Sequence, residues 1–461
     1  MDDIIIGIEC HVSLNTKTKL FCSCALEGSE DPNSRTCDVC VGLPGSKPVL
    51  NKKALDYALK LCLALDCEIA PELIFSRKIY FYPDMGKNYQ ITQYEVPLGV
   101  GGHIKLASSK IINLTRVHME EDPGALIHQG NTVLVDYNRS GTPLCEIVTE
   151  PEMSSPEEAR DFLKRLLSII QYLQIFDIDS CIIKADANIS IKGFERVEIK
   201  NINGFKDIQK ALEYEISRQR SLVSEGKGIK HRETRGWDSD KGITIFQRSK
   251  ELEADYGYII DTDLVITDIT NIIVEETKKH LPELPDDKII RFVKDFKLKK
   301  DDAEVIANDF DLAHLFEKAI DDGVNPIFAS EWIRREVSRV LNYSKKDIDE
   351  SFIKQHLLEV LELINHNKIT RQTGQRIMEL LVNEDLDVKK YVKDNNLESV
   401  SNTDELEKIC LEAIKNNKQA VDEYKAGNEK SFNFIVGQVM KLSKGKASPS
   451  VVNDLLKKLI K

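Results

Sequence analysis

The N-terminal stretch Ile4-Ile5-Ile6-Gly7-Ile8-Glu9-Cys10-His11-Val12 joins a short apolar run to two chemically active side chains. Its β-branched residues favour a strand. Side chains two residues apart on a strand point to the same face, so Glu9 and His11 are expected to lie together. The stretch therefore predicts a strand that carries a carboxylate and an imidazole into one cleft.

Two later stretches also place carboxylates in or beside strand-like runs: His118-Met119-Glu120-Glu121-Asp122 and Leu144-Cys145-Glu146-Ile147-Val148-Thr149-Glu150. Converging acids are costly to bury without a cation, and an oxygen-rich site suits Mg²⁺, often together with substrate phosphates. If the three stretches meet, they predict a phosphoryl-transfer site. The alternative is that the acids are solvated residues at strand edges, with an ordinary acidic turn before Pro123-Gly124.

Four cysteines form two close pairs, Cys22-Ser23-Cys24 and Cys37-Asp38-Val39-Cys40. Four thiolates from two such pairs can surround Zn²⁺ tetrahedrally and leave no open position for chemistry. The spacing therefore predicts a structural zinc that staples a polar loop, against the alternative of four free thiols. The remaining cysteines are scattered in apolar contexts and are interpreted as small buried residues.

Composition places the chain among soluble proteins with more than one domain. It has 461 residues, 41% hydrophobic and 30% charged, with a net charge of −12. The apolar runs are too short for a membrane span, and no secretory leader opens the chain, so we expect a cytoplasmic protein without membrane contact. From Lys430 onward seven lysines face one aspartate, so this tail favours a phosphate-backbone contact or, alternatively, is a solvated helical surface.

Strands and helices are mixed up to about residue 280. Alternating patterns predict the following strands: Ile111–Val117, Val133–Tyr137, Ile182–Ile191, Arg196–Ile199 and Ile243–Arg248. Ser155-Pro156-Glu157-Glu158 has the residues of a capping box and predicts a helix start, and a second helix is expected from about Asp207 to Val223. Because turns separate the strands as often as helices do, an antiparallel α+β layout is favoured over a doubly wound sheet.

Two prolines in Leu281-Pro282-Glu283-Leu284-Pro285 predict a domain boundary. Beyond it the apolar spacing is helical throughout. We therefore expect a β-rich cradle domain over 1–282 with a zinc-stapled loop, an all-helical domain over 283–400 and a small helical tail domain over 401–461.

Long motifs spread over nearly the whole chain resemble the GatB family, the B subunits of the aspartyl/glutamyl-tRNA(Asn/Gln) amidotransferases. They are Gly7–Val12, Cys22–Gly45, Arg77–Asp84, Tyr89–Gln93, His118–Gly124, Asp136–Pro151, Asp186–Ser190, Val197–Asn201 and Phe434–Gln438. The related tRNA(Gln)-specific E subunits carry a large inserted domain, for which this chain has no counterpart.

The resemblance implies an ATP-dependent ligase. Such enzymes phosphorylate the side-chain carboxylate of Asp on tRNA(Asn), of Glu on tRNA(Gln), or of both, and then amidate it with ammonia. The chain has no amidase signature with a catalytic lysine, so the resemblance implies that the A and C subunits, as partners in a heterotrimer, supply the ammonia. It also implies that the tail domain binds tRNA.

Carried over position by position, the family's pocket residues fall on Glu9, His11, Glu121 and Glu146. The resemblance implies that the three acids hold Mg²⁺ and its waters, and that His11 is a ligand or takes a proton from the incoming ammonium. No residue is assigned to the adenine.

The chain departs from the family pattern at Asp255-Tyr256-Gly257-Tyr258-Ile259-Ile260, where an arginine and a proline are lost, at Cys10, and at Lys184, where arginine is frequent. A rival interpretation is a non-catalytic tRNA-binding adaptor, which gives the clustered acids no role. A P-loop kinase is excluded because its Gly-rich lysine motif does not occur.

Overall fold

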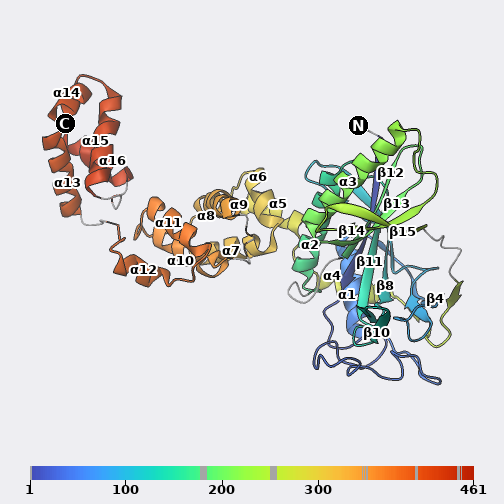
Figure 1. Ribbon diagram of the computed structural model, residues 1–461. Helices are drawn as coiled ribbons and strands as arrows, with labels where there is room; N and C mark the ends of the chain where they lie inside the picture. Colours follow the sequence, from blue (N-terminus) through green and yellow to red (C-terminus); the bar gives the residue numbers. More distant parts are fainter. Residues whose placement is uncertain are drawn as a thin grey trace. The chain divides into compact units, whose positions relative to one another are not determined.

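The computed structural model describes residues 3–176, 184–249, 257–344, 346, 348, 351–399, 403–443, 447 and 449–460. Within it the chain forms two compact units, Met1–Leu284 and Pro285–Lys461. The first contains the large sheet and the second is helical in its described part (Figure 1). The division into domains at 282/283 and 400/401 stays a prediction.

A ten-stranded sheet forms the first unit, in the order β15-β14-β13-β12-β1-β11-β8-β6-β2, with β7 paired to β8. Its strands are β1 (Ile4–Ser13), β2 (Glu68–Ile69), β6 (Gly99–Val100), β7 (His103–Lys105), β8 (Ile111–Glu121), β11 (Pro143–Thr149), β12 (Lys184–Ile191), β13 (Val197–Asn203), β14 (Glu233–Asp238) and β15 (Ile243–Ser249). Strands β13 and β14 are parallel, and the other neighbouring pairs are antiparallel. The predicted β-rich α+β fold is confirmed.

Three smaller sheets surround this one, β16-β4-β5, β10-β9 and β17-β3. Their strands are β3 (Glu72–Leu73), β4 (Ser76–Ile79), β5 (Tyr89–Thr92), β9 (Ala125–Gln129), β10 (Thr132–Asp136), β16 (Gly257–Ile260) and β17 (Thr267–Asp268). Of the departures noted in the sequence, Asp255 and Tyr256 lie outside the described residues, as do Ile182 and Ile183 of one predicted strand.

Four helices complete the first unit: α1 (Lys52–Ala64), α2 (Pro156–Leu173), α3 (Phe205–Ser224) and α4 (Asn271–Lys279). The predicted start of α2 is confirmed, because the Ser155 side chain accepts a hydrogen bond from the Glu158 amide. The return bond of the capping box differs from expectation: Glu158 accepts from the amide of Ser154 rather than from that of Ser155.

One face of the sheet packs against α1, α2 and α3 and forms the core of the unit. Figure 1 shows α2 and α3 lying side by side along the strands. On β1 the alternate residues Ile6, Ile8, Cys10 and Val12 are fully buried in this core. Their neighbours Glu9 and His11 therefore point to the opposite face, which carries the polar side chains described below.

The second unit consists of helices α5 (Pro285–Asp295), α6 (Lys300–Ala307), α7 (Phe310–Asp321), α8 (Pro326–Trp332), α9 (Ser338–Ser344), α10 (Ile353–Asn365), α11 (Arg371–Leu381), α12 (Val388–Asp394), α13 (Thr403–Asn416), α14 (Lys418–Lys425), α15 (Glu429–Leu442) and α16 (Pro449–Leu459), with a π-helical turn at Ile333–Val337. Helices α13 to α16 enclose a core of their own, including Cys410, Ile435 and Leu456. The basic residues Lys444 and Lys446 lie outside the described part.

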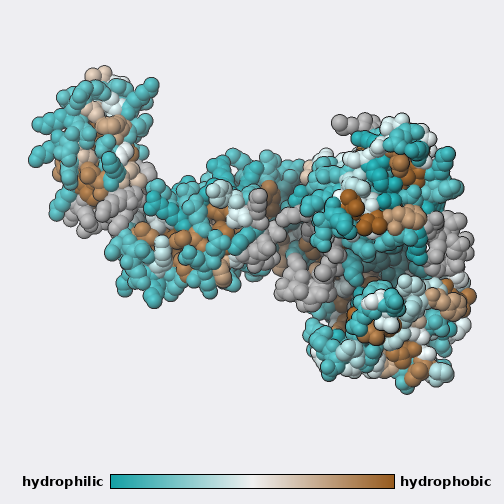
Figure 2. Space-filling view, viewed as in Figure 1, coloured by the Kyte–Doolittle hydropathy of each residue, from teal (hydrophilic) through white to brown (hydrophobic). Residues whose placement is uncertain are grey.

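The viewed surface is largely hydrophilic, with hydrophobic residues in separate patches (Figure 2). No helix among the described residues has the length and apolar character needed to cross a lipid bilayer. Many apolar side chains of the first unit are gathered in the core beneath the three helices, whereas others, such as Phe81 and Val265, are exposed.

Candidate active site and metal-binding clusters

The register of the sheet brings acids from several strands to one face on either side of β1. His11 lies opposite Glu146 of β11, and Glu9 lies opposite Asp186 of β12. Two groups result, His11 with Glu120 and Glu146, and Glu9 with Asp186 and Glu198, and the potential ligand atoms within each group lie within 4.8 Å of one another. The predicted convergence of the three sequence stretches is therefore present in the fold.

The first group, called here the His11 group, consists of His11, Glu120 and Glu146. Its closest contact joins His11 Nδ1 to Glu120 Oε1 at 3.3 Å. Burial opposes a charge on His11, but hydrogen bonding to Glu120 and the charges of Glu120 and Glu146 outweigh it and raise the pKa of His11 to about 9. Burial likewise opposes the charge of Glu120, but the nearby imidazoles of His11 and His118 bring its pKa below the usual range. The group thus concentrates negative charge around an imidazole.

Glu121 lies elsewhere. It follows Glu120 on β8, so its side chain points to the other face of the sheet, where it is 2% exposed and pairs with Lys87. Its carboxylate also accepts a hydrogen bond of 2.8 Å from the amide of Ile91. The structure therefore joins His11 and Glu146 to Glu120 and keeps Glu121 apart from them.

The second group, Glu9, Asp186 and Glu198, surrounds the ammonium of Lys200. The Lys200 Nζ lies 2.7 Å from Asp186 Oδ2 and 3.3 Å from Glu198 Oε1. Burial would lower the pKa of Lys200, but the charges of Asp186 and Glu198 raise it above the usual range. A fixed cation therefore already balances part of the charge in this group.

The four predicted cysteines also come together. Their sulfur atoms lie within 4.8 Å of one another, in a loop that follows β1 and precedes α1. The amide of Cys37 donates to Cys40 Sγ at 3.1 Å, and a hydrogen bond from Cys22 together with the nearby Lys19 ammonium lowers the pKa of Cys40 to about 5. Tetrahedral thiolates around zinc lie about 3.8 Å apart, so this donor set fits a structural zinc ion.

The cysteine loop is tied to the turn that joins β10 to β11. Lys19 is fully buried, and its Nζ lies 3.6 Å from Cys40 Sγ and 3.1 Å from the carbonyl oxygen of Tyr137. Asn33 binds the same region through its side chain, accepting from the amide of Tyr137 and donating to the carbonyl of Val135. The loop therefore braces the segment that leads into β11, a strand of the His11 group.

Comparison with known proteins identifies the family. The family model described as "GatB/GatE catalytic domain" matches residues 4–275, and the model described as "GatB domain" matches residues 314–460. The chain belongs to the GatB family.

Curated relatives of this GatB chain match it from end to end. It is 44% identical to the B subunit of the aspartyl/glutamyl-tRNA(Asn/Gln) amidotransferase of Persephonella marina over 470 residues, with 99% of each chain covered. The B subunit of the Carboxydothermus hydrogenoformans amidotransferase is also 44% identical, over 99% of this chain and 98% of the relative. That of Clostridium beijerinckii is 41% identical with the same coverage.

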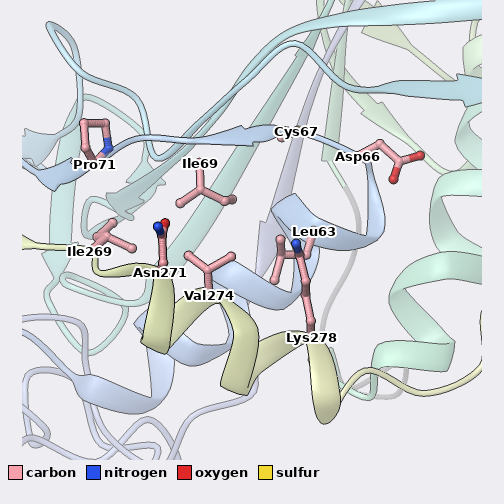
Figure 3. A pocket seen from close by; sticks show the side chains of 9 residues that line it. All are labelled: Leu63, Asp66, Cys67, Ile69, Pro71, Ile269, Asn271, Val274 and Lys278. Carbon is pink, nitrogen blue, oxygen red and sulfur yellow. The ribbon is translucent and has the colours of Figure 1, made fainter.

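A groove of about 410 Å³ lies elsewhere in the first unit of this GatB chain, between α1 and α4 (Figure 3). Val274 and Lys278 line it from α4, and Leu63 from α1. Lys278 also pairs with Glu275. None of the acids of the two sheet groups lines this groove, so it is separate from the candidate active site.

Sequence reasoning did not single out two residues that the fold brings to this face of the sheet, Glu120 in the His11 group and His118 beside it. Both precede the end of β8, and a signal for them is present in the sequence, because residues two apart on a strand share a face. The expected strand ends at Val117, which leaves His118–Asp122 without an assigned face. Thr92 of β5, whose hydroxyl donates to Glu120 at 3.4 Å, comes from a distant strand and has no such signal.

Proposed function

We propose that this chain carries the two chemical steps of transamidation on misacylated tRNA. In the first step the side-chain carboxylate of Asp on tRNA(Asn), of Glu on tRNA(Gln), or of both, receives the γ-phosphoryl group of ATP. In the second step ammonia replaces phosphate and leaves the amide. Membership of the family supports this assignment, as do the names of the relatives, which are amidotransferase B subunits.

The observation that carries the proposal is the His11 group. Two carboxylates and one imidazole within 4.8 Å fit a hard divalent cation such as Mg²⁺, whose opposite ligands lie about 4.2 Å apart. Glu9, two residues from His11, is proposed to extend the site toward the second group and to hold a water ligand of the cation. Bound there, Mg²⁺ would neutralise charge on the phosphates of ATP during transfer.

The two steps make and break bonds of the substrate, ATP and ammonia, and the residues of the site hold these groups and transfer protons. In the first step a carboxylate oxygen of the substrate forms a bond to the γ-phosphorus, and the bond to ADP breaks. In the second step the nitrogen of ammonia bonds to the acyl carbon, the bond to phosphate breaks, and one proton leaves the nitrogen. His11 is proposed either as a cation ligand or as the acceptor of a proton from incoming ammonium, and both roles require its neutral imidazole, whereas pairing with Glu120 favours the protonated form.

The A and C subunits of the amidotransferase are the proposed partners, and glutamine hydrolysis by these partners is the proposed source of ammonia. The helical tail, with its lysines after residue 430, is proposed to contact the tRNA backbone. The cysteine cluster is proposed to hold zinc as a structural element. The proposed location of the protein is the cytoplasm, where tRNA is aminoacylated.

Ammonium chloride in place of glutamine tests the proposal directly. The chain is combined with the A and C subunits, ATP, Mg²⁺ and misacylated tRNA, and amide formation is compared between wild type and Glu146→Gln. Because ammonium bypasses glutamine hydrolysis, loss of product in Glu146→Gln with tRNA binding intact would assign the chemistry to this chain.

Glu150→Gln is the matched control. Glu150 directly follows β11 and accepts a hydrogen bond from Thr115, outside both acid groups. It should retain activity close to wild type. Equal product from wild type, Glu146→Gln and Glu120→Gln would contradict the proposal and favour the adaptor interpretation.

A further inference from the structure

His118 lies beside the His11 group without belonging to it. Its side chain is 5% exposed, and its Nε2 lies 3.6 Å from Glu146 Oε2 and 3.9 Å from Glu120 Oε2. The register explains both distances, because His118 lies opposite Glu146 on the neighbouring strand and two residues before Glu120 on its own. One side chain therefore reaches both acids of the candidate site.

The surroundings of Nδ1, the other ring nitrogen of His118, indicate which of the two nitrogens carries the hydrogen. Nδ1 of His118 is buried, and no residue in the described part of the chain forms a hydrogen bond with it. Burying an N–H group without an acceptor costs free energy. Burying an unprotonated ring nitrogen without a donor costs less. The neutral tautomer that avoids a stranded donor carries its hydrogen on Nε2, which faces the two carboxylates.

We infer that His118 is a positioning residue: its Nε2–H donates to Glu120 and Glu146 and turns both carboxylates toward the cation that they share with His11. Both distances exceed a hydrogen bond, and rotation of the two carboxylates about their side-chain bonds would bring each within hydrogen-bonding distance of Nε2. Arg116, whose Nη2 lies 3.9 Å from Glu146 Oε1, contacts Glu146 at its other oxygen. The inference rests on the proposed function, since it requires a cation at the His11 group.

The physical reason for such a residue is that the backbone alone does not fix the orientation of the two carboxylates. A carboxylate on a strand can rotate about its side-chain bonds, and each lost rotation costs binding free energy. Outer partners that hold metal ligands in place typically account for about 10–100-fold in metal affinity. His118 is the described side chain that contacts both acids from the β8 side.

The test measures Mn²⁺ binding to the full-length chain by the electron paramagnetic resonance signal of free Mn²⁺, with Mn²⁺ standing in for Mg²⁺. His118→Leu should weaken binding by about 10–100-fold. His118→Gln, whose side-chain N–H can donate in the same direction, should restore most of this loss. His128→Leu, on the exposed β9 strand, is the matched control and should bind as wild type does.

Thermal unfolding of each variant is followed in parallel, so that a folding defect is recognised. Wild-type affinity in His118→Leu would overturn the inference. So would an equal loss in His118→Leu and folded His118→Gln, because the donated hydrogen bond would then not be the cause. Absence of Mn²⁺ binding in the wild type would instead remove the cation site of the proposed function itself, and with it the inference.

Discussion

The cysteine cluster and the His11 group assemble their ligands in opposite ways. The four cysteines lie on a loop between β1 and α1, where the described residues form no strand longer than an isolated bridge. The members of the His11 group lie on β1, β8 and β11, whose hydrogen bonds set the spacing of their side chains.

The difference concerns what holds each site together. A loop with little core depends on its metal for its shape, so metal binding and folding of the loop are one process. A sheet fixes the backbone positions of its residues whether or not a cation is bound. The first cluster, proposed to hold zinc, should therefore be sensitive to removal of zinc, and the second to loss of a single carboxylate.

The largest expected effect is at the loop. Cys37→Ser removes one thiolate, and since zinc binding to such sites contributes about 10 kcal/mol or more, the loop over 14–50 should lose both zinc and its fixed shape. Zinc content by elemental mass spectrometry and limited proteolysis of the loop measure the two consequences. Cys67→Ser, a buried cysteine outside the cluster, is the control. Full zinc content in Cys37→Ser would contradict the prediction.

The next effect separates the neighbouring residues Glu121 and Glu120. Glu121→Gln leaves the Lys87 ammonium, 4% exposed, without its acid, which should cost about 3–5 kcal/mol in the free energy of unfolding. Denaturant unfolding followed by tryptophan fluorescence in a Trp332→Phe background measures this loss of stability in the first unit. Trp237, in the first unit, is then the remaining tryptophan of the chain. Mn²⁺ affinity should remain close to that of the wild type.

Glu120→Gln should show the reverse pattern. It removes a ligand and should weaken Mn²⁺ binding more than about 10-fold, with a smaller loss of stability than Glu121→Gln. Loss of Mn²⁺ affinity in Glu121→Gln but not in Glu120→Gln would show that the assignment taken from the resemblance, Glu121, is the correct one.

A smaller effect tests the role of His11. Its pKa is raised to about 9, so at neutral pH the imidazole carries a proton that competes with a cation. As pH rises from 7 toward 9 this competition falls, and Mn²⁺ affinity should increase about tenfold per pH unit, with about one proton released on binding. Calorimetry in buffers of different ionisation enthalpy measures the released proton. A flat profile would favour His11 as proton acceptor rather than ligand.

The smallest expected effect concerns the contact between the loop and the β9–β10 hairpin. Asn33 has a positive φ of 60°, and its side chain holds Val135 and Tyr137. Asn33→Gly keeps the backbone conformation and removes these side-chain bonds, so the hairpin should lose about 1 kcal/mol of local stability for each bond. Hydrogen exchange of residues 125–136 measures the loss. Unchanged exchange would show that the loop does not brace the hairpin.

Local sequence patterns were sufficient to predict features that depend on neighbouring residues alone. Ser155 caps α2 as predicted, and Glu9 and His11 share a face because alternation on β1 depends only on their spacing. To decide whether Glu120 or Glu121 shares a face with Glu146, one must know where β8 ends. That end depends on pairing with Pro143 and Leu144 of a different strand. The buried Lys87 that accompanies Glu121 comes from a third segment, so the sequence around Glu121 carries no sign of it.

The position of β1 has a consequence for the order in which the protein forms. Strand β1 lies inside the sheet and pairs with much later segments: the amide of Ile8 bonds to Thr149, 141 residues later, and Glu9 bonds to Asn188, 179 residues later. Contacts of such long range form slowly, and an unpaired apolar strand is prone to aggregate while it waits. Ile4–Ser13 therefore cannot form its native pairs until β11 and β12 have both been synthesised, and the nascent chain is prone to aggregate over that interval.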